Sequence, residues 1–360
     1  MLLRVPGQGS VIGIDATLGR GGRSTANCGK TPAWSSYLNF LADFAQKALI
    51  YKAYDVDTMF CNDYIDLRKP YNSYEIGSQK GQAMKRMKHT SIWMFGNNKG
   101  GVGKTTISLN MAAAISEMNK TCLYIDIDDS TNSSFHLKLE GSGEGAFPVS
   151  RLFMDKTVNV VDCLQWQTKL PGVALIRSER GLKKDLAQFV NNNEKREIEA
   201  MSHRFANKLQ ELDGLFDFII IDVGPSMDSA LGMVLEAVTH YVFVADSSQY
   251  AEQGIYNVLE DVPRLNPGVE DGIELVGAVY SNINMNSNFA RSIVTRKDIA
   301  SGVPLIPIFI PHRVEVPENM LSGGFAVGPG KDTVLADSLR RLAGVMKDRT
   351  QVNYPGAISE

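Results

Sequence analysis

A glycine-rich segment with two lysines is the part of the sequence best suited to bind phosphate. It reads Lys99-Gly100-Gly101-Val102-Gly103-Lys104-Thr105-Thr106. Glycines let successive backbone N–H groups converge on one anion. A lysine at the end of such a loop can pair with the β- and γ-phosphates of a nucleotide, and the next hydroxyl can bind Mg²⁺. The segment therefore predicts a site for a nucleoside triphosphate with Mg²⁺.

The residues on both sides of this segment predict the elements that a phosphate loop needs. Ile92–Phe95 form a short apolar run, and apolar residues recur at helical spacing over 105–118. A helix that begins at the loop turns its positive end toward the bound anion. Asn98 stands where the strict motif has its first glycine, and asparagine is among the residues that tolerate a left-handed backbone.

Beyond residue 90 the sequence predicts an α/β fold with a mostly parallel sheet flanked by helices. Continuous apolar runs that alternate with helical patterns are typical of strands buried on both faces of such a sheet. Right-handed crossovers then place helices on both sides. The predicted strands are 92–95, 122–127, 218–223, 241–245, 276–280 and 305–310.

Aspartates follow two of these predicted strands. Asp126 and Asp128 come at the end of the run at 122–127, and Asp222 ends the run at 218–223. Carboxylates at strand ends beside a phosphate loop can hold Mg²⁺ and its waters, and can orient an attacking water. We therefore expect these three side chains to belong to the same site as the glycine-rich loop.

The first ninety residues differ in pattern from the rest of the chain. Residues 1–32 are rich in Gly, Ser and Thr and predict a mobile arm. Residues 33–89 contain an amphipathic helical pattern and a basic run from Lys80 to Lys88, which predicts a small helical module. The predicted division is thus an arm at 1–32, a module at 33–89, an α/β domain with the nucleotide loop at 90–350 and a tail at 351–360.

Composition narrows the classes of protein to which the chain can belong. Its 360 residues carry a formal net charge of −3, and no apolar run approaches the length that spans a bilayer. The four cysteines are widely spaced, which argues against a disulfide framework and a zinc site and suits a reducing cytoplasm. Any contact with nucleic acid must use a local basic patch.

The loop resembles the deviant Walker A motif of the ParA/MinD superfamily, in which a signature lysine precedes two glycines. The resemblance extends over roughly residues 90–350. Tyr124–Asp128 is similar to the strand of this family that ends in D-x-D, and Phe218–Asp222 resembles its Walker B strand. Asp129-Ser130 departs from the family, where ParA proteins usually have Pro-Gln. The layout of the module at 33–89 resembles that of long ParA proteins from plasmids, which implies a helix-turn-helix or a dimerisation region.

A later segment resembles the part of ParA proteins that lies near the adenine. Ile310-Pro311-His312-Arg313, followed by Glu318 and Phe325, is similar to the run I-P-R-N-x-x-x-x-E-A. The resemblance implies that Pro311 packs near the base and that Asn282 makes a second adenine contact. The implied nucleotide-binding residues are Lys99, Gly100, Gly101, Val102, Gly103, Lys104, Thr105, Thr106, Asn282 and Pro311.

The resemblance also implies a Mg²⁺-dependent ATPase that forms a homodimer on ATP. Lys99 is expected to reach into the site of the partner and stabilise the γ-phosphate, as an arginine finger does elsewhere. Lys104 is assigned to the phosphates and Asp128 to the attacking water. Thr105, Asp126 and Asp222 are the expected Mg²⁺ residues.

The ParA branch fits best, because polar residues (Asn97 and Asn98) precede the signature lysine. We expect a cytoplasmic, nucleoid-associated partitioning ATPase that binds DNA non-specifically and is stimulated by a ParB-like centromere-binding protein. Candidate DNA residues are Arg291, Arg296, Lys297, Arg340 and Arg341. The last helical pattern, from Leu335 to Met346, favours a helix docked on the domain, so no stable membrane association is expected. The alternatives are a nucleotide-modulated autorepressor and a MinD-like ATPase that positions at a membrane or pole.

Overall fold

The computed structural model describes most of the chain from residue 89 to residue 350 and two short segments near the N-terminus. The described residues are 2–4, 11–13, 89–139, 145–224, 228–262, 265, 273–293, 296–299, 302–312 and 324–350. Strands β1 (Leu2–Arg4) and β2 (Val11–Gly13) pair antiparallel, which the sequence did not predict. The rest of the predicted arm, nearly all of the module at 33–89 and the tail at 351–360 lie outside the described residues, and their assignments stay predictions.

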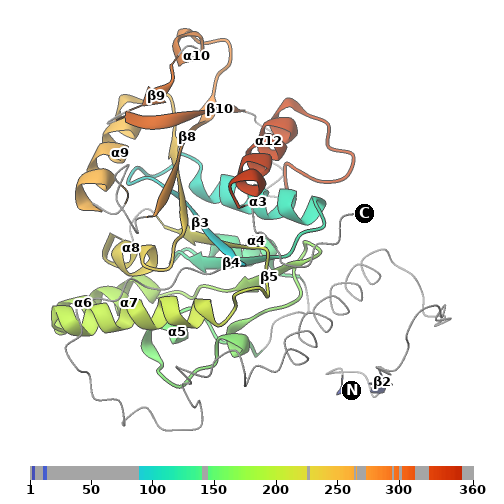
Figure 1. Cartoon of the computed structure of the whole chain (residues 1–360), viewed down its shortest axis with the longest axis vertical. Coiled ribbons are helices and arrows are strands. Elements are labelled where there is room, and N and C mark those ends of the chain that lie inside the picture. The colour runs from blue at the N-terminus through green and yellow to red at the C-terminus, as the bar shows by residue number, and fades with distance from the viewer. Residues whose placement is uncertain are drawn as a thin grey trace.

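An eight-stranded sheet forms the centre of the described chain (Figure 1). All neighbouring strands pair in parallel except β9, which is antiparallel to β10. The predicted fold class is therefore confirmed. In spatial order the strands are β5 (Val173–Ile176), β4 (Cys122–Ile127), β6 (Phe218–Val223), β3 (Ser91–Gly96), β7 (His240–Ala245), β8 (Glu274–Ile283), β10 (Val303–Pro311) and β9 (Asp298–Ile299).

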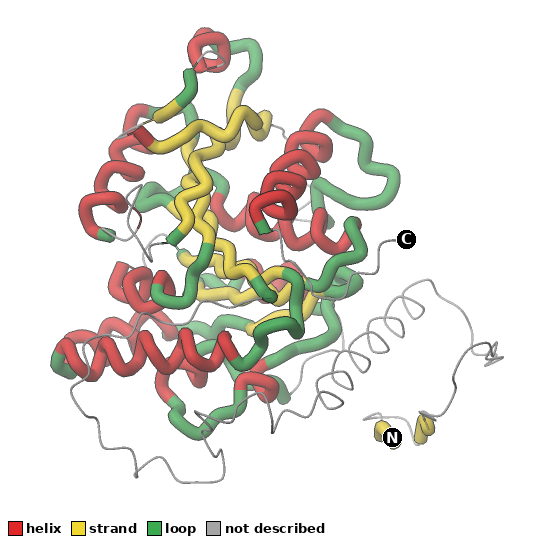
Figure 2. The backbone as a smooth tube through the Cα atoms, in the orientation of Figure 1, coloured by secondary structure: helices red, strands yellow, loops and turns green. Residues whose placement is uncertain are grey.

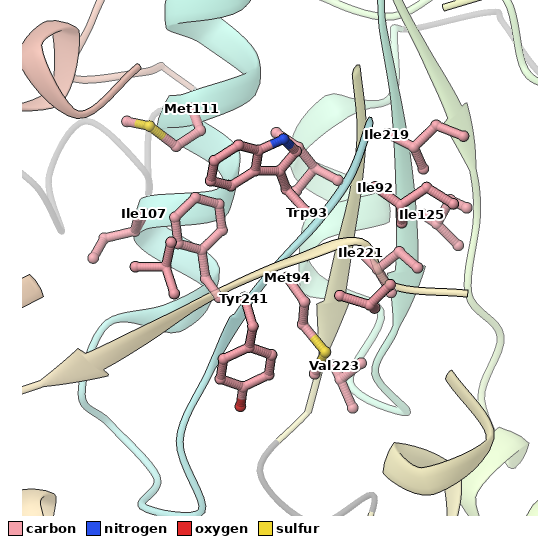
Figure 3. Packing of buried hydrophobic residues seen from close by; sticks show 14 of the residues in the cluster. Ile92, Trp93, Met94, Ile107, Met111, Ile125, Ile219, Ile221, Val223 and Tyr241 are labelled. Atoms are coloured by element: carbon pink, nitrogen blue, oxygen red, sulfur yellow. The ribbon is translucent and has the colours of Figure 1, made fainter. Parts of the chain in front are cut away.

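The central strands are buried on both faces, as their continuous apolar sequences predict. Every residue of β3, β4 and β6 is buried. Successive side chains of a strand point to opposite faces. Figure 3 shows Ile107 and Met111 of helix α3 beside Trp93 of β3, while Ile92 lies near Ile219 of the neighbouring strand. The apolar core thus fixes the position of β3, the strand that enters the predicted phosphate loop.

Helices cover both sides of the sheet (Figures 1 and 2). Helices α3 and α12 pack against each other on one side, and α8 and α9 lie on the other, where α7 packs on α8. The described helices are α3 (Lys104–Glu117), α4 (Asn132–Leu137), α5 (Ser150–Met154), α6 (Leu182–Asn192), α7 (Lys195–Gln210), α8 (Asp228–Leu235), α9 (Gln249–Asp261), α10 (Asn288–Ile293) and α12 (Val334–Arg349), with a 3₁₀ turn at Val160–Cys163.

The parallel sheet brings the carboxyl ends of its strands to one edge. The β3 strand leads into α3, and the register of β4 and β6 places Asp126 directly beside Asp222. Ligand sites in such sheets lie at this edge, outside the ends of the strands. The predicted site residues that end strands therefore meet at the N-terminus of α3.

Helix α12 confirms the helix predicted near the C-terminus. The Thr333 hydroxyl accepts a hydrogen bond from Ala336 N at 3.1 Å and so caps the helix. Leu335, Leu339, Leu342 and Met346 are buried, and the helix packs on α3 and β10. Among the described residues, none of the helices combines the length and the apolar character needed to cross a bilayer.

Candidate functional site

The phosphate loop joins β3 to α3 and takes its shape from two glycines. Gly101 has φ 77° and Gly103 has φ 99°, in the left-handed region that favours glycine. A Cβ atom on Gly103 would lie 2.7 Å from Ser281 Oγ, so this glycine also allows the loop to approach the end of β8. Asn98 does not adopt a left-handed backbone, and the turn expected there is made by Gly101 and Gly103 instead.

Lys104 lies at the start of α3 with its side chain turned along the inside of the loop. The residue is 7 % exposed, and its Nζ donates to the Lys99 carbonyl oxygen at 3.0 Å. Burial lowers the pKa of Lys104, although nearby Asp222 and Asp128 act in the opposite direction. A buried cation beside backbone amides at a helix N-terminus gains free energy from an anion with several acceptor oxygens.

Asp222 is the centre of a hydrogen-bonded network behind the loop. The residue is 1 % exposed and its Oδ1 accepts from Thr105 Oγ1 at 3.2 Å. Its Oδ2 accepts from Ser133 Oγ at 2.7 Å and from Tyr124 OH at 3.0 Å. Burial raises the pKa of Asp222, and these hydroxyl donors counter that rise. The network thus places the Thr105 hydroxyl and the Asp222 carboxylate, two of the groups predicted for the Mg²⁺ site, in direct hydrogen-bond contact.

Asp126 lies beside Asp222, but its carboxylate accepts hydrogen bonds from residues of the segment that follows β4. Its Oδ2 accepts from Ser134 N at 2.8 Å and from Ser134 Oγ at 2.6 Å, and its Oδ1 accepts from Asp128 N at 3.2 Å. Burial, reinforced by Asp222, raises the pKa of Asp126 to about 7. This carboxylate therefore holds the start of α4 in place, and its contribution to the Mg²⁺ site stays a prediction.

Asp128 reaches the mouth of the site from the loop after β4. Its carboxylate accepts from Ser130 N at 3.2 Å and from Ser130 Oγ at 2.8 Å. A Cβ atom on Gly224, just after β6, would lie 2.5 Å from Asp128 Oδ1. The absence of a side chain at Gly224 therefore makes room for this carboxylate beside Asp222 and Lys104.

These residues fit a magnesium nucleotide. The loop glycines and buried Lys104 supply donors and charge for phosphates, and Thr105 with Asp222 supplies hard oxygen donors. Mg²⁺ is commonly held by one or two protein oxygens, phosphates and waters. The part of the chain that the structure describes contains no cluster of three or more His, Cys, Asp or Glu side chains arranged for a metal.

Lys99, the signature lysine, is held by a residue that the sequence reasoning missed. Lys99 Nζ donates to Asp246 Oδ2 in an ion pair. Asp246 follows β7, the neighbour of β3, so it reaches the loop from the adjacent strand end. Like Asp128, Asp246 directly follows a predicted strand, and this position in the sequence was the signal that could have identified it.

Asn97 ties the loop to α9 and was not predicted to act in the site. Its Nδ2 donates to Val244 O at 2.7 Å and to Ala251 O at 3.1 Å. Its Oδ1 accepts from Lys99 N at 3.0 Å. Gly254 of α9 packs against this amide, because a Cβ atom there would lie 2.2 Å from Asn97 Oδ1.

Replacement of Gly254 by alanine is expected to destabilise the protein and weaken nucleotide binding. Alanine would force Asn97 away and break the hydrogen bonds that hold the backbone of Lys99. Overpacking of this kind costs about 1–3 kcal/mol. Urea unfolding and ATP affinity measure the two effects.

Gly344→Ala is the matched control, because Gly344 also lies inside a helix and a Cβ there would meet nothing within 4 Å. Helix propensity alone favours alanine over glycine by about 1 kcal/mol, so this control should be neutral or stabilising. A Gly254→Ala protein as stable as the Gly344→Ala protein would contradict the packing role of Gly254.

The predicted adenine residues lie at the ends of β8 and β10. Asn282 is exposed with φ 59°, and its Oδ1 is hydrogen-bonded to His312 Nδ1. Pro311 is buried and pairs in register with Ile283. Phe325 instead packs edge-on against His136 of α4, with ring centroids 4.7 Å apart. The adenine contacts stay predictions, and Arg313 and Glu318 lie outside the described residues.

Asp129 has a structural role that explains its departure from Pro-Gln. Its Oδ1 accepts from Gly181 N at 2.7 Å and from Lys183 N at 3.2 Å. These amides belong to the N-terminus of α6, where the first N–H groups lack helical partners. The loop after β4 is thereby fixed to α6. Proline has no carboxylate to make this contact, and the sequence pattern does not predict it.

Comparison of sequences identifies related proteins. A family model described as an AAA domain matches residues 90–274. A chromosome partitioning protein ParA from Myxococcus xanthus is 22% identical over 222 residues, which cover 62% of this chain and 75% of the relative. The sporulation initiation inhibitor protein Soj from Bacillus subtilis is 24% identical over 254 residues, or 70% of this chain and 93% of the relative.

Comparison with solved structures supports the α/β fold described above. Cobyrinic acid a,c-diamide synthase from Mycobacterium smegmatis, with a bound ATP analogue and magnesium, superposes with a TM-score of 0.58 at 20% identity. The match covers 73% of this chain and 96% of that structure. The family model matches the part of the chain that holds the loop and the strand-end carboxylates, whereas the first 89 residues lie outside the matched domain.

Proposed function

Because this chain belongs to the ParA/MinD family of P-loop ATPases, we propose that it is a partitioning ATPase that uses ATP to control its association with DNA. The observation that carries the proposal is the meeting of Lys99, Lys104, Asp128 and Asp222 at one edge of the sheet. Two cations and two carboxylates around a glycine-rich helix N-terminus suit hydrolysis of a nucleoside triphosphate. Adenine as the base follows the family relationship.

Each residue has a defined part in the proposed reaction. Lys104 and the amides of Gly101–Thr106 hold the β- and γ-phosphates, while the Thr105 hydroxyl and, through water, Asp222 hold Mg²⁺. Asp128 orients the attacking water. Asp126 keeps α4 and Asp128 in position from behind the site. Magnesium, when bound, supplies positive charge that stabilises the transferred phosphoryl group.

ATP is proposed to close two subunits face to face into a homodimer. Lys99 of one subunit then reaches the γ-phosphate held by the other and acts on it as an arginine finger does. The position of Lys99 at the exposed mouth of the loop, next to exposed Gly100 and Gly101, supports this role. Lys99→Ala should therefore prevent dimer closure.

DNA is proposed to bind the closed dimer through basic residues of both subunits. Three of the candidate cations are exposed: Arg291 of α10, Lys297 before β9 and Arg341 of α12. Arg296 and Arg340 are engaged in ion pairs, with Glu252 at 2.8 Å and Glu117 at 2.8 Å. Arg291, Lys297 and Arg341 are therefore better candidates for phosphate contacts than the ion-paired Arg296 and Arg340.

Retention on random-sequence DNA should depend on ATP in a measurable way. Binding is measured with Mg²⁺-ATP and with Mg²⁺-ADP over a range of salt concentrations. We expect tighter binding with ATP and a log–log salt slope that becomes shallower by about 2 for the dimer of a Lys297→Ala protein, one phosphate contact being lost per subunit. Arg340→Ala is the control and should leave the slope nearly unchanged.

Equal DNA binding with ATP and ADP would contradict the proposal that nucleotide controls DNA association. A centromere-binding partner and residence on the nucleoid are further parts of the proposal, which follow from the relationship to the ParA and Soj relatives. Stimulation of hydrolysis by such a partner, added to the protein with DNA, tests them separately.

A further inference from the structure

Lys99 is fixed to its own subunit at its backbone and at its side chain. Its backbone N–H donates to Asn97 Oδ1 at 3.0 Å, and its carbonyl accepts from Lys104 Nζ at 3.0 Å. The side chain ends in the ion pair with Asp246, where the two side chains are 27 % and 17 % exposed. The signature lysine thus has a partner in cis, within reach of its own loop.

Asp246 is itself held firmly at the start of α9. Its Oδ1 accepts from Ser248 N at 3.0 Å and from Ser248 Oγ at 2.6 Å, which leaves Oδ2 directed at Lys99. Burial by itself would raise the pKa of Asp246, but the hydrogen bonds from Lys99 and Ser248 outweigh it and hold that pKa below its usual range. The carboxylate is therefore charged and oriented before any partner arrives.

We propose that Asp246 is a positioning residue that holds Lys99 in cis, so that dimer closure must first break this ion pair. The inference rests on the proposed dimer and deepens it, because it names what opposes closure. Lys99 cannot remain beside Asp246 of its own subunit and also reach the γ-phosphate in the partner. The strength of the Lys99–Asp246 pair therefore sets part of the threshold at which ATP drives dimerisation.

The size of the effect follows from the exposure of the pair. A partly exposed ion pair contributes up to about 1 kcal/mol of stabilising free energy, which corresponds to a factor of up to about five in an equilibrium constant. A symmetric dimer breaks two such pairs, so the factors multiply. A threefold effect for each subunit becomes about tenfold in the dissociation constant of the dimer.

The test compares dimerisation of the wild-type and Asp246→Asn proteins by analytical ultracentrifugation with Mg²⁺ and a non-hydrolysable ATP analogue. Asparagine keeps an oxygen for Ser248 and replaces only the charge that faces Lys99. We expect the Asp246→Asn dimer to be about tenfold tighter at low salt. The difference from wild type should shrink as salt rises, because salt screens the wild-type ion pair.

Two further variants separate the ion pair from local structure. Asp246→Glu restores the charge and should return the dissociation constant toward the wild-type value. Ser248→Ala removes the Oγ hydrogen bond at the start of α9 and leaves the carboxylate charge, so it should not tighten the dimer about tenfold. Circular dichroism of each protein confirms that the fold is kept.

The outcomes distinguish this inference from the proposed function. A wild-type protein that dimerises, with an Asp246→Asn dimer of equal or lower affinity, overturns the holding role of Asp246 and leaves the dimer proposal intact. If neither protein dimerises with the analogue, the proposed dimer fails and the role of Asp246 fails with it. A tighter Asp246→Asn dimer whose advantage does not fall with salt also overturns the ion-pair explanation.

Discussion

Lys104→Ala is expected to abolish nucleotide binding while the protein remains folded. Lys104 is buried at the N-terminus of α3, where its ammonium group interacts electrostatically with Asp222 and Asp128. In the ATP complex this ammonium group is proposed to pair with the β- and γ-phosphates, and loss of one partner of a buried charge pair costs about 3–5 kcal/mol of binding free energy, or roughly 10²–10⁴-fold in ATP affinity. Calorimetric titration with Mg²⁺-ATP measures this loss.

The fold should tolerate this change because alanine favours helices and removes a cation that burial disfavours. Lys120→Ala is the matched control, since Lys120 pairs with Asp217 at 3.3 Å, away from the loop, and is 42 % exposed. The ATP affinity of the Lys120→Ala protein should stay within about threefold of wild type, because an exposed ion pair contributes little stabilising free energy. Lys104→Ala protein that binds ATP as tightly as this control would contradict the assignment of Lys104.

Asp128→Ala is expected to slow hydrolysis sharply and to leave nucleotide bound. The carboxylate lies at the mouth of the site against Gly224, so its loss removes the group proposed to orient the attacking water. The loss of a positioned acid–base or water-orienting group lowers the rate by about 10²–10⁴-fold. Single-turnover hydrolysis and nucleotide affinity, measured together, separate a chemical defect from a binding defect.

The neighbouring acid provides a control for Asp128. Asp129→Asn removes a charge one residue away but keeps the oxygen that accepts from Gly181 N and Lys183 N. Its hydrolysis rate should stay within about threefold of wild type, because the α6 contact is retained and the group is not proposed to touch the nucleotide. If Asp129→Asn were as slow as Asp128→Ala, the specific role of Asp128 would be lost.

The fold and the centre of the site could be predicted because they depend on local patterns. Six strands appeared as continuous apolar runs, and the loop appeared as glycines and lysines at fixed spacing. Strand β5 (Val173–Ile176) was missed because four residues give too short a signal, and β9 has only two residues. Strand-end aspartates could be grouped since parallel strands end at the same edge.

Contacts between distant segments could not be predicted in the same way. Asn97 and Ala251 are 154 residues apart, and their hydrogen bond requires that β7 neighbour β3. The cis ion pair of Lys99 with Asp246 depends on the same strand order. Asp129 could be read as a departure from the family, but its role at α6 is visible only when both segments are placed in space.

The most direct test of the account is hydrogen–deuterium exchange of the wild-type protein with and without Mg²⁺-ATP. Backbone amides of the phosphate loop should exchange more slowly once they bind phosphate, so we predict protection in peptides that cover residues 97–107, with a smaller effect at 126–134. Protection should require Mg²⁺ and be absent from the Lys104→Ala protein. Unchanged exchange at residues 97–107 in saturating Mg²⁺-ATP would contradict the central claim that this loop is the nucleotide site.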